Sequence, residues 1–299
     1  MDLSKLENQI REAEANIQDE RKYQKALEIM ELYSGADKVI SSETALQEIQ
    51  AQRQENGQIK DYLTGIPRLD ALIGGFREGQ LVVLSAPTGQ GKTLFCQDLT
   101  RRFAEKEINC LWFNYEVGNE EFFERFKNQA PSFYLPRKIK GSSLEWLKFR
   151  ILEGIAKFNT KVIFIDHLHF LLNMDDMAKA KNLSLLIGML MRDLKTIAVR
   201  TNTIIFLVSH LRKTLMEKSP TIEDLRDSSF VAQESDIVML LWRLKSKDKK
   251  NRDTGHAEYL NESRLVVEKN RRTGNLGGLK LVVNQGRFEE EINLDNLQL

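Results

Sequence analysis

The stretch Leu81–Thr93, LVVLSAPTGQGKT, limits the possible folds of this chain more than any other part of the sequence. Its four leading apolar residues predict a buried β-strand, which runs into a glycine-rich turn and then a helix. The turn fits A-x-x-x-x-G-K-T, a phosphate loop with Ala86 in place of the usual first glycine. A chance glycine-rich turn is the alternative, but the strand–loop–helix context favours a nucleotide-binding α/β domain.

The residue types in this loop suit a triphosphate. Several backbone N–H groups must point at one place, and Gly89 and Gly91 allow the chain to wrap that closely. A helix that begins near Lys92 adds the positive end of its dipole. We expect Lys92 to reach the β- and γ-phosphates and the Thr93 hydroxyl to bind Mg²⁺. The predicted nucleotide-binding residues are Ala86, Pro87, Thr88, Gly89, Gln90, Gly91, Lys92 and Thr93.

Length and composition predict a soluble globular protein. The 299 residues fit one large domain, or one domain with an appendage, and 41% of them are hydrophobic. Two cysteines without a CxxC motif exclude a zinc ribbon and disfavour a disulfide framework. No secretory signal or membrane-length apolar run is visible, so we expect a cytoplasmic protein without membrane contact. The net charge of +1 leaves nucleic-acid binding to local patches.

Residues 1–56 differ from the rest of the chain. Apolar residues recur there at helical spacing on a charged background, and a second helical run over roughly 42–54 starts at a Ser-Ser-Glu-Thr cluster that can cap it. These helices have too few apolar residues for a core of their own. We expect a helical arm, or linker, that packs on something else such as a neighbouring subunit. A hairpin folded back on its own domain is the alternative.

Residues 57–299 are expected to form the nucleotide-binding domain. Apolar strands alternate there with helices, which predicts a mostly parallel sheet. A loop with one short helix over 63–76 leads into the first strand, and the last three strands are expected to form hairpins at one edge. The basic run 245–252 is expected to be a solvated hairpin tip. The expected strands are 81–84, 110–115, 162–165, 204–208, 237–242, 264–269 and 279–284, and the expected helices are 94–105, 120–129, 144–157 and 183–200.

Polar residues end several of these strands, where ligands bind in parallel α/β sheets. Asp166 is expected to support Mg²⁺ through water, and Glu116 is the candidate that polarises an attacking water. His210 is a candidate sensor of the γ-phosphate. Each has a purely structural alternative: Asp166 could cap a loop, Glu116 could be a carboxylate at the rim, and His210 could be a hydrogen-bonded polar group. His167 and His169 have no supporting cysteine or carboxylate cluster, so we predict no zinc site.

The order of segments resembles the replicative DNA helicases of the DnaB type, the helicase half of bacteriophage primase-helicases and the mitochondrial Twinkle protein. The resemblance covers roughly residues 57–291. It rests on TGIPRLDALIGGF, SAPTGQGKT, NYEVG, VIFIDHLHFL and FLVSHLRK. Two later stretches, DLRDSSFVAQESDIVMLLWR and VVEKNRRTGNLG, distinguish this family from other RecA-like ATPases.

The resemblance implies a RecA-like P-loop ATPase fold with a mostly parallel central sheet, preceded by a short helical N-terminal arm. It implies a helicase that hydrolyses ATP, or another NTP, with Mg²⁺, and that moves on single-stranded DNA as a ring, expected to be a hexamer. Lys269 and Arg271 would then act on the nucleotide of the next subunit, where an arginine finger can be worth about 10³–10⁵ in rate. The implied roles within one subunit are phosphate and metal binding for Lys92, Thr93 and Asp166, catalytic base for Glu116, and coupling of the γ-phosphate to DNA for His210.

DNA contacts are also implied by the resemblance. Asp227-Ser228-Ser229 departs from the family's usual Glu-Ser-Gly, which leaves the contacts of this loop open. Segment 173–182 is a further candidate for the channel, and the scarcity of aromatics favours backbone gripping over base stacking. The predicted DNA-binding residues are Arg212, Lys213, Arg226, Asp227 and Ser229.

The N-terminal part departs from the family. No globular helical domain or primase zinc module precedes the ATPase segment, so the chain is expected to be a minimal helicase or a shortened piece of one. Primase and a helicase loader are candidate partners, and the source is expected to be a bacterial, phage or plasmid replication system. Two alternatives stay open: a RadA-like recombination or branch-migration ATPase, and a nucleotide-dependent assembly factor that does not unwind DNA. The set Glu116, Asp166 and Arg271 disfavours the second.

Overall fold

In the computed structural model the chain consists of two units, 1–59 and 60–299. In the first, helix α2 (Ser42–Asn56) confirms the predicted helical run. Its cap forms as expected, because the Ser41 hydroxyl accepts a hydrogen bond from the Thr44 N–H at 3.1 Å. The other predictions for 1–38 lie outside the described residues, and the boundary at 56/57 stays a prediction. The structure describes residues 39–56, 61–126, 129–139, 143–167, 171, 183–211, 220–225, 228–250 and 257–291.

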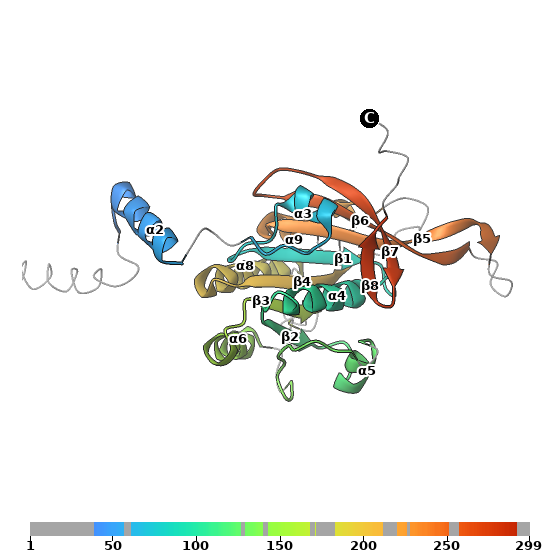
Figure 1. Cartoon of the computed structure of the whole chain (residues 1–299), viewed down its shortest axis with the longest axis horizontal. Coiled ribbons are helices and arrows are strands. Elements are labelled where there is room, and N and C mark those ends of the chain that lie inside the picture. The colour runs from blue at the N-terminus through green and yellow to red at the C-terminus, as the bar shows by residue number, and fades with distance from the viewer. Residues whose placement is uncertain are drawn as a thin grey trace, which may run out of the picture. The chain divides into compact units, whose positions relative to one another are not determined.

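In the second unit, the described residues contain one eight-stranded sheet with the order β2-β3-β4-β1-β5-β6-β7-β8 (Figure 1). The pairings from β2 to β5 are parallel, and those from β5 to β8 are antiparallel. The predicted mostly parallel sheet with hairpins at one edge is therefore confirmed. The strands are β1 (Leu81–Ala86), β2 (Cys110–Asn114), β3 (Val162–Asp166), β4 (Ile204–His210), β5 (Ile237–Lys250), β6 (Ala257–Asn270), β7 (Gly277–Asn284) and β8 (Arg287–Glu290).

Helices cover both faces of this sheet, as continuous apolar strands require. Alternate residues of β1 enter two separate cores: Val82 packs in the core that includes residues of α3 and α4, and Val83 packs in the core that includes residues of α6 and α8. Local signals set the helix ends, since Ser143 caps α6 and Gly74 ends α3 in the left-handed region. The helices are α3 (Pro67–Ile73), α4 (Lys92–Ala104), α5 (Asn119–Glu124), α6 (Leu144–Phe158), α8 (Leu183–Thr201) and α9 (Ser228–Glu234), with a short 3₁₀ turn at Ile222–Asp224.

Two predictions about these elements were wrong, and one strand was missed. Strand β5 continues to Lys250 and pairs with β6 from Ala257, so most of the basic run 245–252 is strand. Antiparallel backbone pairing can continue past the apolar core because polar side chains are then simply solvated. Helix α5 ends at Glu124 instead of residue 129. The short polar strand β8 was not predicted, since its one core residue is Phe288.

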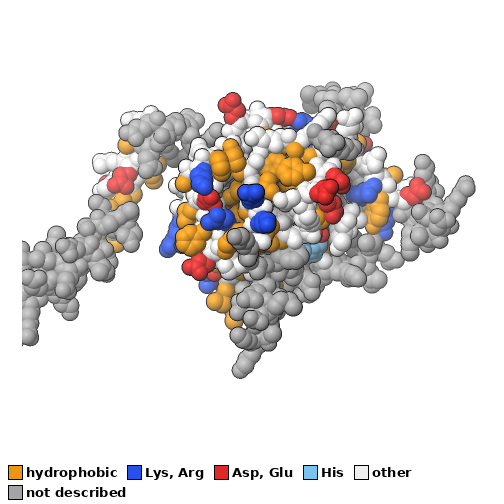
Figure 2. Space-filling model, turned by 90° about the horizontal axis from the view of Figure 1, so that it is seen from below, with side chains coloured by type: hydrophobic (Ala, Val, Ile, Leu, Met, Phe, Trp, Pro, Cys, Tyr) orange, Lys and Arg blue, Asp and Glu red, His pale blue; other side chains and the backbone are white. Residues whose placement is uncertain are grey.

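The face seen in Figure 2 mixes hydrophobic and basic side chains. Helix α6 exposes Phe149, Leu152 and Phe158. Apolar and charged side chains alternate across this face, in the ordinary way of a protein surface. Among the described residues, no helix is both long and apolar enough to cross a membrane.

Candidate active site

The loop between β1 and α4 has the backbone of an anion site. Gly89 and Gly91 have φ values of +73° and +93°, which side-chain-bearing residues rarely adopt. Gly91 caps α4 without a side-chain hydrogen bond, so the first N–H groups of the helix are available to an anionic ligand. The sequence TGQGK therefore produces a turn that fits phosphate.

Lys92 lies under this loop and is almost entirely buried. Its ammonium donates to the carbonyl oxygens of Ala86 and Pro87, at 3.2 Å and 3.4 Å. The same nitrogen lies 3.1 Å from Nδ1 of His210. Burial lowers the pKa of Lys92, and the nearby carboxylates raise it. The loop lysine and the end of β4 are thus in direct contact.

Thr93 and Asp166 form the acidic side of the site. The Thr93 hydroxyl donates to Oδ2 of Asp166 at 2.6 Å. The other carboxylate oxygen, Oδ1, is buried and accepts no hydrogen bond from the described residues. Burial raises the pKa of Asp166 to about 6, and the hydrogen bond from Thr93 acts in the opposite direction. A hydroxyl oxygen beside an under-used carboxylate oxygen fits Mg²⁺, which prefers oxygen ligands.

Glu116 lies at the exposed rim, two residues beyond the end of β2. Asn114 pairs with Asp166 across β2 and β3, and its side chain shapes the following turn. The Asn114 amide donates to the Val117 carbonyl at 2.8 Å. The charge of Glu116 acts on both Lys92 and Asp166. Asn114 was not singled out in the sequence, although asparagine at the end of a strand is a known turn signal.

His210 ends β4, opposite Ala86 at the end of β1. The ring of His167 meets the ring of His210 edge-on, with 4.5 Å between their centroids. His169 lies outside the described residues. Among the residues that the structure describes, no group of three or more His, Cys, Asp or Glu side chains could hold a metal ion. The His167–His210 contact joins the ends of β3 and β4 beside the loop lysine.

Arg271 and Lys269 lie at the end of the sheet where β1 begins, opposite the end that carries the phosphate loop. Asn270 pairs with Ile237 on β5, which in turn pairs with Val82 near the start of β1. The phosphate loop follows the other end of β1, after Ala86. Because strands rise about 3.3 Å per residue, the length of β1 separates the loop from these two cations. The fold therefore brings together the predicted residues of the loop, β2, β3 and β4, but not these two cations.

Almost all the predicted DNA-binding residues fall outside the part of the chain that the structure describes. Arg212, Lys213, Arg226 and Asp227 lie outside the described residues, as does segment 173–182. Ser229 belongs to the first turn of α9, and its side chain is not described. The DNA contacts of these residues remain predictions.

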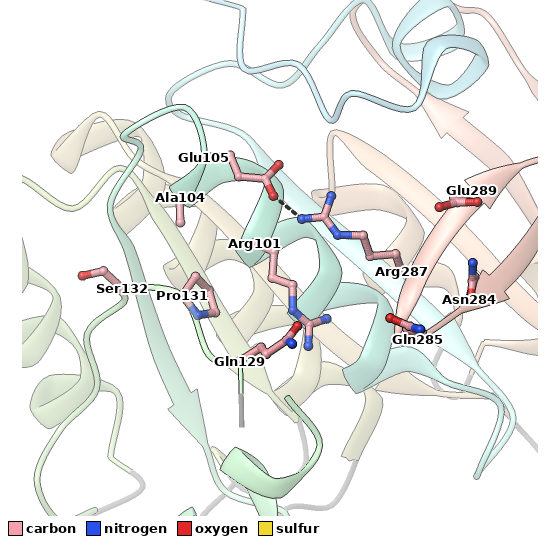
Figure 3. A pocket seen from close by; sticks show the side chains of 10 residues that line it. All are labelled: Arg101, Ala104, Glu105, Gln129, Pro131, Ser132, Asn284, Gln285, Arg287 and Glu289. Carbon is pink, nitrogen blue, oxygen red and sulfur yellow. Dashed lines mark hydrogen bonds and ion pairs between the residues drawn. The ribbon is translucent and has the colours of Figure 1, made fainter. Parts of the chain in front are cut away.

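A pocket of about 480 Å³ lies beside α4 and was not predicted (Figure 3). The Arg101 guanidinium donates to the Gly286 carbonyl at 3.1 Å and to the Phe126 carbonyl at 3.2 Å. Arg287 forms an ion pair with Glu105 at its rim. No sequence motif marked this site, because its walls come from three separate segments. The lining residues are Arg101, Ala104, Glu105, Gln129, Pro131, Ser132, Asn284, Gln285, Arg287 and Glu289.

Most of this chain is similar in sequence to a known protein family. The family model described as the DnaB-like helicase C-terminal domain matches residues 62–145 and 137–290. The replicative DNA helicase DnaB of Leifsonia xyli is 25% identical over 259 residues, covering 76% of this chain and 55% of that protein. The protein of the same name from Mycoplasma pneumoniae is 26% identical over 253 residues, covering 71% and 53%. The chain spans about half the length of the curated relatives it matches.

Two solved structures share the fold. One, described as an ATPase domain, superposes with a TM-score of 0.68 and 20% identity, covering 83% of this chain and 98% of that chain. A DnaB-like replicative helicase, described together with its interactions with primase, has a TM-score of 0.65 and 21% identity, covering 93% and 76%. The predicted RecA-like fold class is confirmed by these likenesses.

Proposed function

This chain belongs to the DnaB-like helicase C-terminal domain family, and we propose on that ground that it is an ATP-dependent DNA helicase. It would move along single-stranded DNA as a ring, a hexamer in this proposal, and hydrolyse ATP at the interfaces between subunits. The observation that carries the proposal is the separation of Arg271 from the phosphate loop of its own chain. A site that needs both groups is complete only between two copies.

ATP, or another NTP, would place its phosphates on the loop 86–93. Lys92 lies under that loop, where its ammonium can turn from the backbone carbonyls to the β- and γ-phosphates. Thr93 and Asp166 would hold Mg²⁺ through the Thr93 hydroxyl and the under-used Oδ1. When bound, the ion neutralises charge that develops on the transferred phosphoryl group.

Glu116 would act as the general base. Its carboxylate lies at the exposed rim and its charge acts on both Lys92 and Asp166, so a water molecule between it and a γ-phosphate would be in reach. His210, in contact with Lys92, would report the state of the γ-phosphate to the segment that follows β4. That segment contains Arg212 and Lys213.

Arg271 would stabilise transition-state charge on the nucleotide of the next subunit. Its side chain is half exposed, and its edge of the sheet lies opposite the loop. Lys269 would assist it, although its ammonium here donates to carbonyls at the end of α9. DNA in the central channel would contact the predicted residues Arg212, Lys213, Arg226, Asp227 and Ser229.

The relatives also bear on the partners and the location of this chain. The curated relatives include bacterial proteins named replicative DNA helicase DnaB, which supports a cytoplasmic replication protein. One solved relative is described with its interactions with primase, which supports primase as a partner of this chain. A helicase loader is a second candidate partner.

The deciding experiment measures the ATPase rate against protein concentration, with and without single-stranded DNA. The wild type, Arg271→Ala and the control Arg264→Ala are compared, because Arg264 is an exposed arginine on the same strand β6. We expect a rate per subunit that rises with concentration and with DNA, and that collapses only in Arg271→Ala. Binding of a fluorescent ATP analogue should survive that change.

Strand displacement from a forked duplex is measured in parallel. Unwinding that requires ATP supports the helicase. Hydrolysis that is independent of concentration, of DNA and of Arg271 would refute the ring mechanism.

A further inference from the structure

Asp236 lies between α9 and β5, at the same edge of the sheet as Arg271. Its side chain is almost fully buried. The Asp236 backbone carbonyl accepts a hydrogen bond from the Arg271 N–H at 2.8 Å, and its Oδ1 lies 3.5 Å from Nη1 of the guanidinium. We infer that Asp236 is a positioning residue that holds Arg271 ready for the nucleotide of a second copy of this chain. The inference rests on the function proposed above.

A second contact fixes the orientation of the guanidinium. Nη2 of Arg271 donates to the Gln233 carbonyl at 2.7 Å, at the carboxyl end of α9. A guanidinium has five N–H donors in one plane, so two acceptors on one side determine where the others point. The Arg271 side chain remains 51% exposed. The held guanidinium can therefore still meet an anionic group of a neighbouring molecule.

The carboxylate of Asp236 is itself held firmly. Its Oδ2 accepts hydrogen bonds from the Leu81 N–H at 2.8 Å and from the Lys195 ammonium at 2.6 Å. Lys195 also donates to the Gly79 carbonyl at 2.7 Å. Leu81 is the first residue of β1, the strand that ends at the phosphate loop. Asp236, which supports Arg271, thus contacts one end of β1, and the chain's own phosphate loop follows the other end.

The carboxyl end of α9 is fixed in the same way. The Lys269 ammonium donates to the carbonyls of Ala232, Gln233 and Ser235. These three bonds match the three donors of an ammonium. Because one of the three acceptors is the Gln233 carbonyl that Arg271 also uses, Lys269 supports the second contact of the guanidinium. The four residues Asp236, Gln233, Lys269 and Arg271 form what we call the finger socket.

The test is a double-mutant cycle on DNA-stimulated ATP hydrolysis. Asp236→Asn keeps an oxygen for the Leu81 N–H but removes the charge that faces Arg271. We expect it to lower the turnover rate about 10- to 100-fold, as a misplaced catalytic group does. In an Arg271→Ala background the same change should have an effect of less than about twofold, since the residue that it positions is gone.

Glu234→Gln is the matched control. Glu234 lies two residues away, and its carboxylate pairs with Arg192. It should leave the turnover rate unchanged. Binding of a fluorescent ATP analogue should be the same in all the variants, because each chain retains its own loop.

Two results would overturn the inference. The first is an equal loss from Asp236→Asn in both backgrounds, which would mean a general structural role. The second is no loss at all. If Asp236→Asn fails to fold because the Lys195 ammonium loses its carboxylate partner, the cycle is repeated with Asp236→Asn and Lys195→Met combined, which removes the unpaired charge. A failure of the proposed function gives a different result: the Arg271→Ala single variant would then hydrolyse ATP as fast as the wild type.

Discussion

The Thr93 hydroxyl donates a 2.6 Å hydrogen bond to the Asp166 carboxylate and so joins the first turn of α4 to the end of β3. Both side chains are buried, and Asp166 is completely so. The hydrogen bond stabilises the charged form of the carboxylate, but burial has the larger effect and raises its pKa to about 6. At neutral pH the site therefore keeps a carboxylate charged although burial disfavours the charge, and a bound cation would offset that cost.

Asp166→Asn should stabilise the protein at neutral pH. The ordinary pKa of an aspartate is 3.8, so between about pH 4 and pH 6 the folded state binds more protons than the unfolded state. Stability then falls as pH rises through this window, and above it the buried charge costs about 1–3 kcal/mol. We expect the free energy of unfolding of Asp166→Asn to exceed that of the wild type at pH 7, and the difference to vanish near pH 4.

Urea denaturation between pH 4 and pH 7.5 measures this difference. Asp193→Asn is the control, because Asp193 is exposed on α8. The same Asp166 variant should lose Mg²⁺-dependent binding of nucleotide. A variant that is less stable than the wild type at pH 7 would show that the carboxylate is held by more favourable contacts than those described.

Gly91→Ala should weaken nucleotide binding through the backbone. A new Cβ would have room, since the nearest side-chain atom, Cζ of Phe288, lies 3.7 Å away. The φ of +93° is the obstacle, and an L-residue there costs about 1–2 kcal/mol. We expect a corresponding loss of stability and a change of the loop that lowers affinity for ATP. Gly118→Ala, at a position with negative φ and open space, should change both much less.

Gly188→Ala should destabilise the contact between α8 and α9. A Cβ at Gly188 would lie 2.7 Å from Cδ1 of Phe230, so the ring must move. Alanine is the better helix former by about 1 kcal/mol, but overpacking typically costs about 1–3 kcal/mol. We expect a lower midpoint of thermal unfolding, restored when Phe230→Leu is added. A single variant that melts at or above the wild-type temperature would contradict the tight packing of these helices.

Arg101→Met should destabilise the attachment of the β7–β8 hairpin to α4. The buried guanidinium donates to two carbonyls, those of Gly286 and Phe126. The Gly286 carbonyl would lose this donor, and the Phe126 carbonyl would keep the hydrogen bond from the Gln129 N–H. We expect a loss of about 1–3 kcal/mol in urea denaturation. Arg287→Met is the control from the same pocket, because its ion pair with Glu105 is exposed and such pairs contribute about 0–1 kcal/mol. Equal effects of the two changes would refute this assignment.

Local patterns in the sequence predicted much of this fold. The apolar run and the motif SAPTGQGKT predicted β1 and its loop, and the Ser-Ser-Glu-Thr cluster predicted the cap of α2. The alternation of apolar strands with helices predicted a parallel sheet, in which all carboxyl ends lie at one edge. That rule alone was enough to expect Glu116, Asp166 and His210 near the same phosphate loop. Each of these signals lies within a few residues of the feature that it predicts.

Tertiary structure decided what depends on partners far apart in the chain. Asp236 reaches Leu81 across 155 positions, and Arg101 reaches Gly286 across 185. Lys269 supports the end of α9 because the backbone carbonyls there lie opposite its ammonium. Most of the basic run 245–252 is strand because β6 pairs with it. Periodicity and motif spacing describe how a segment folds on itself. Pairing register and packing depend on the whole chain, and so the finger socket could be found only in the folded molecule.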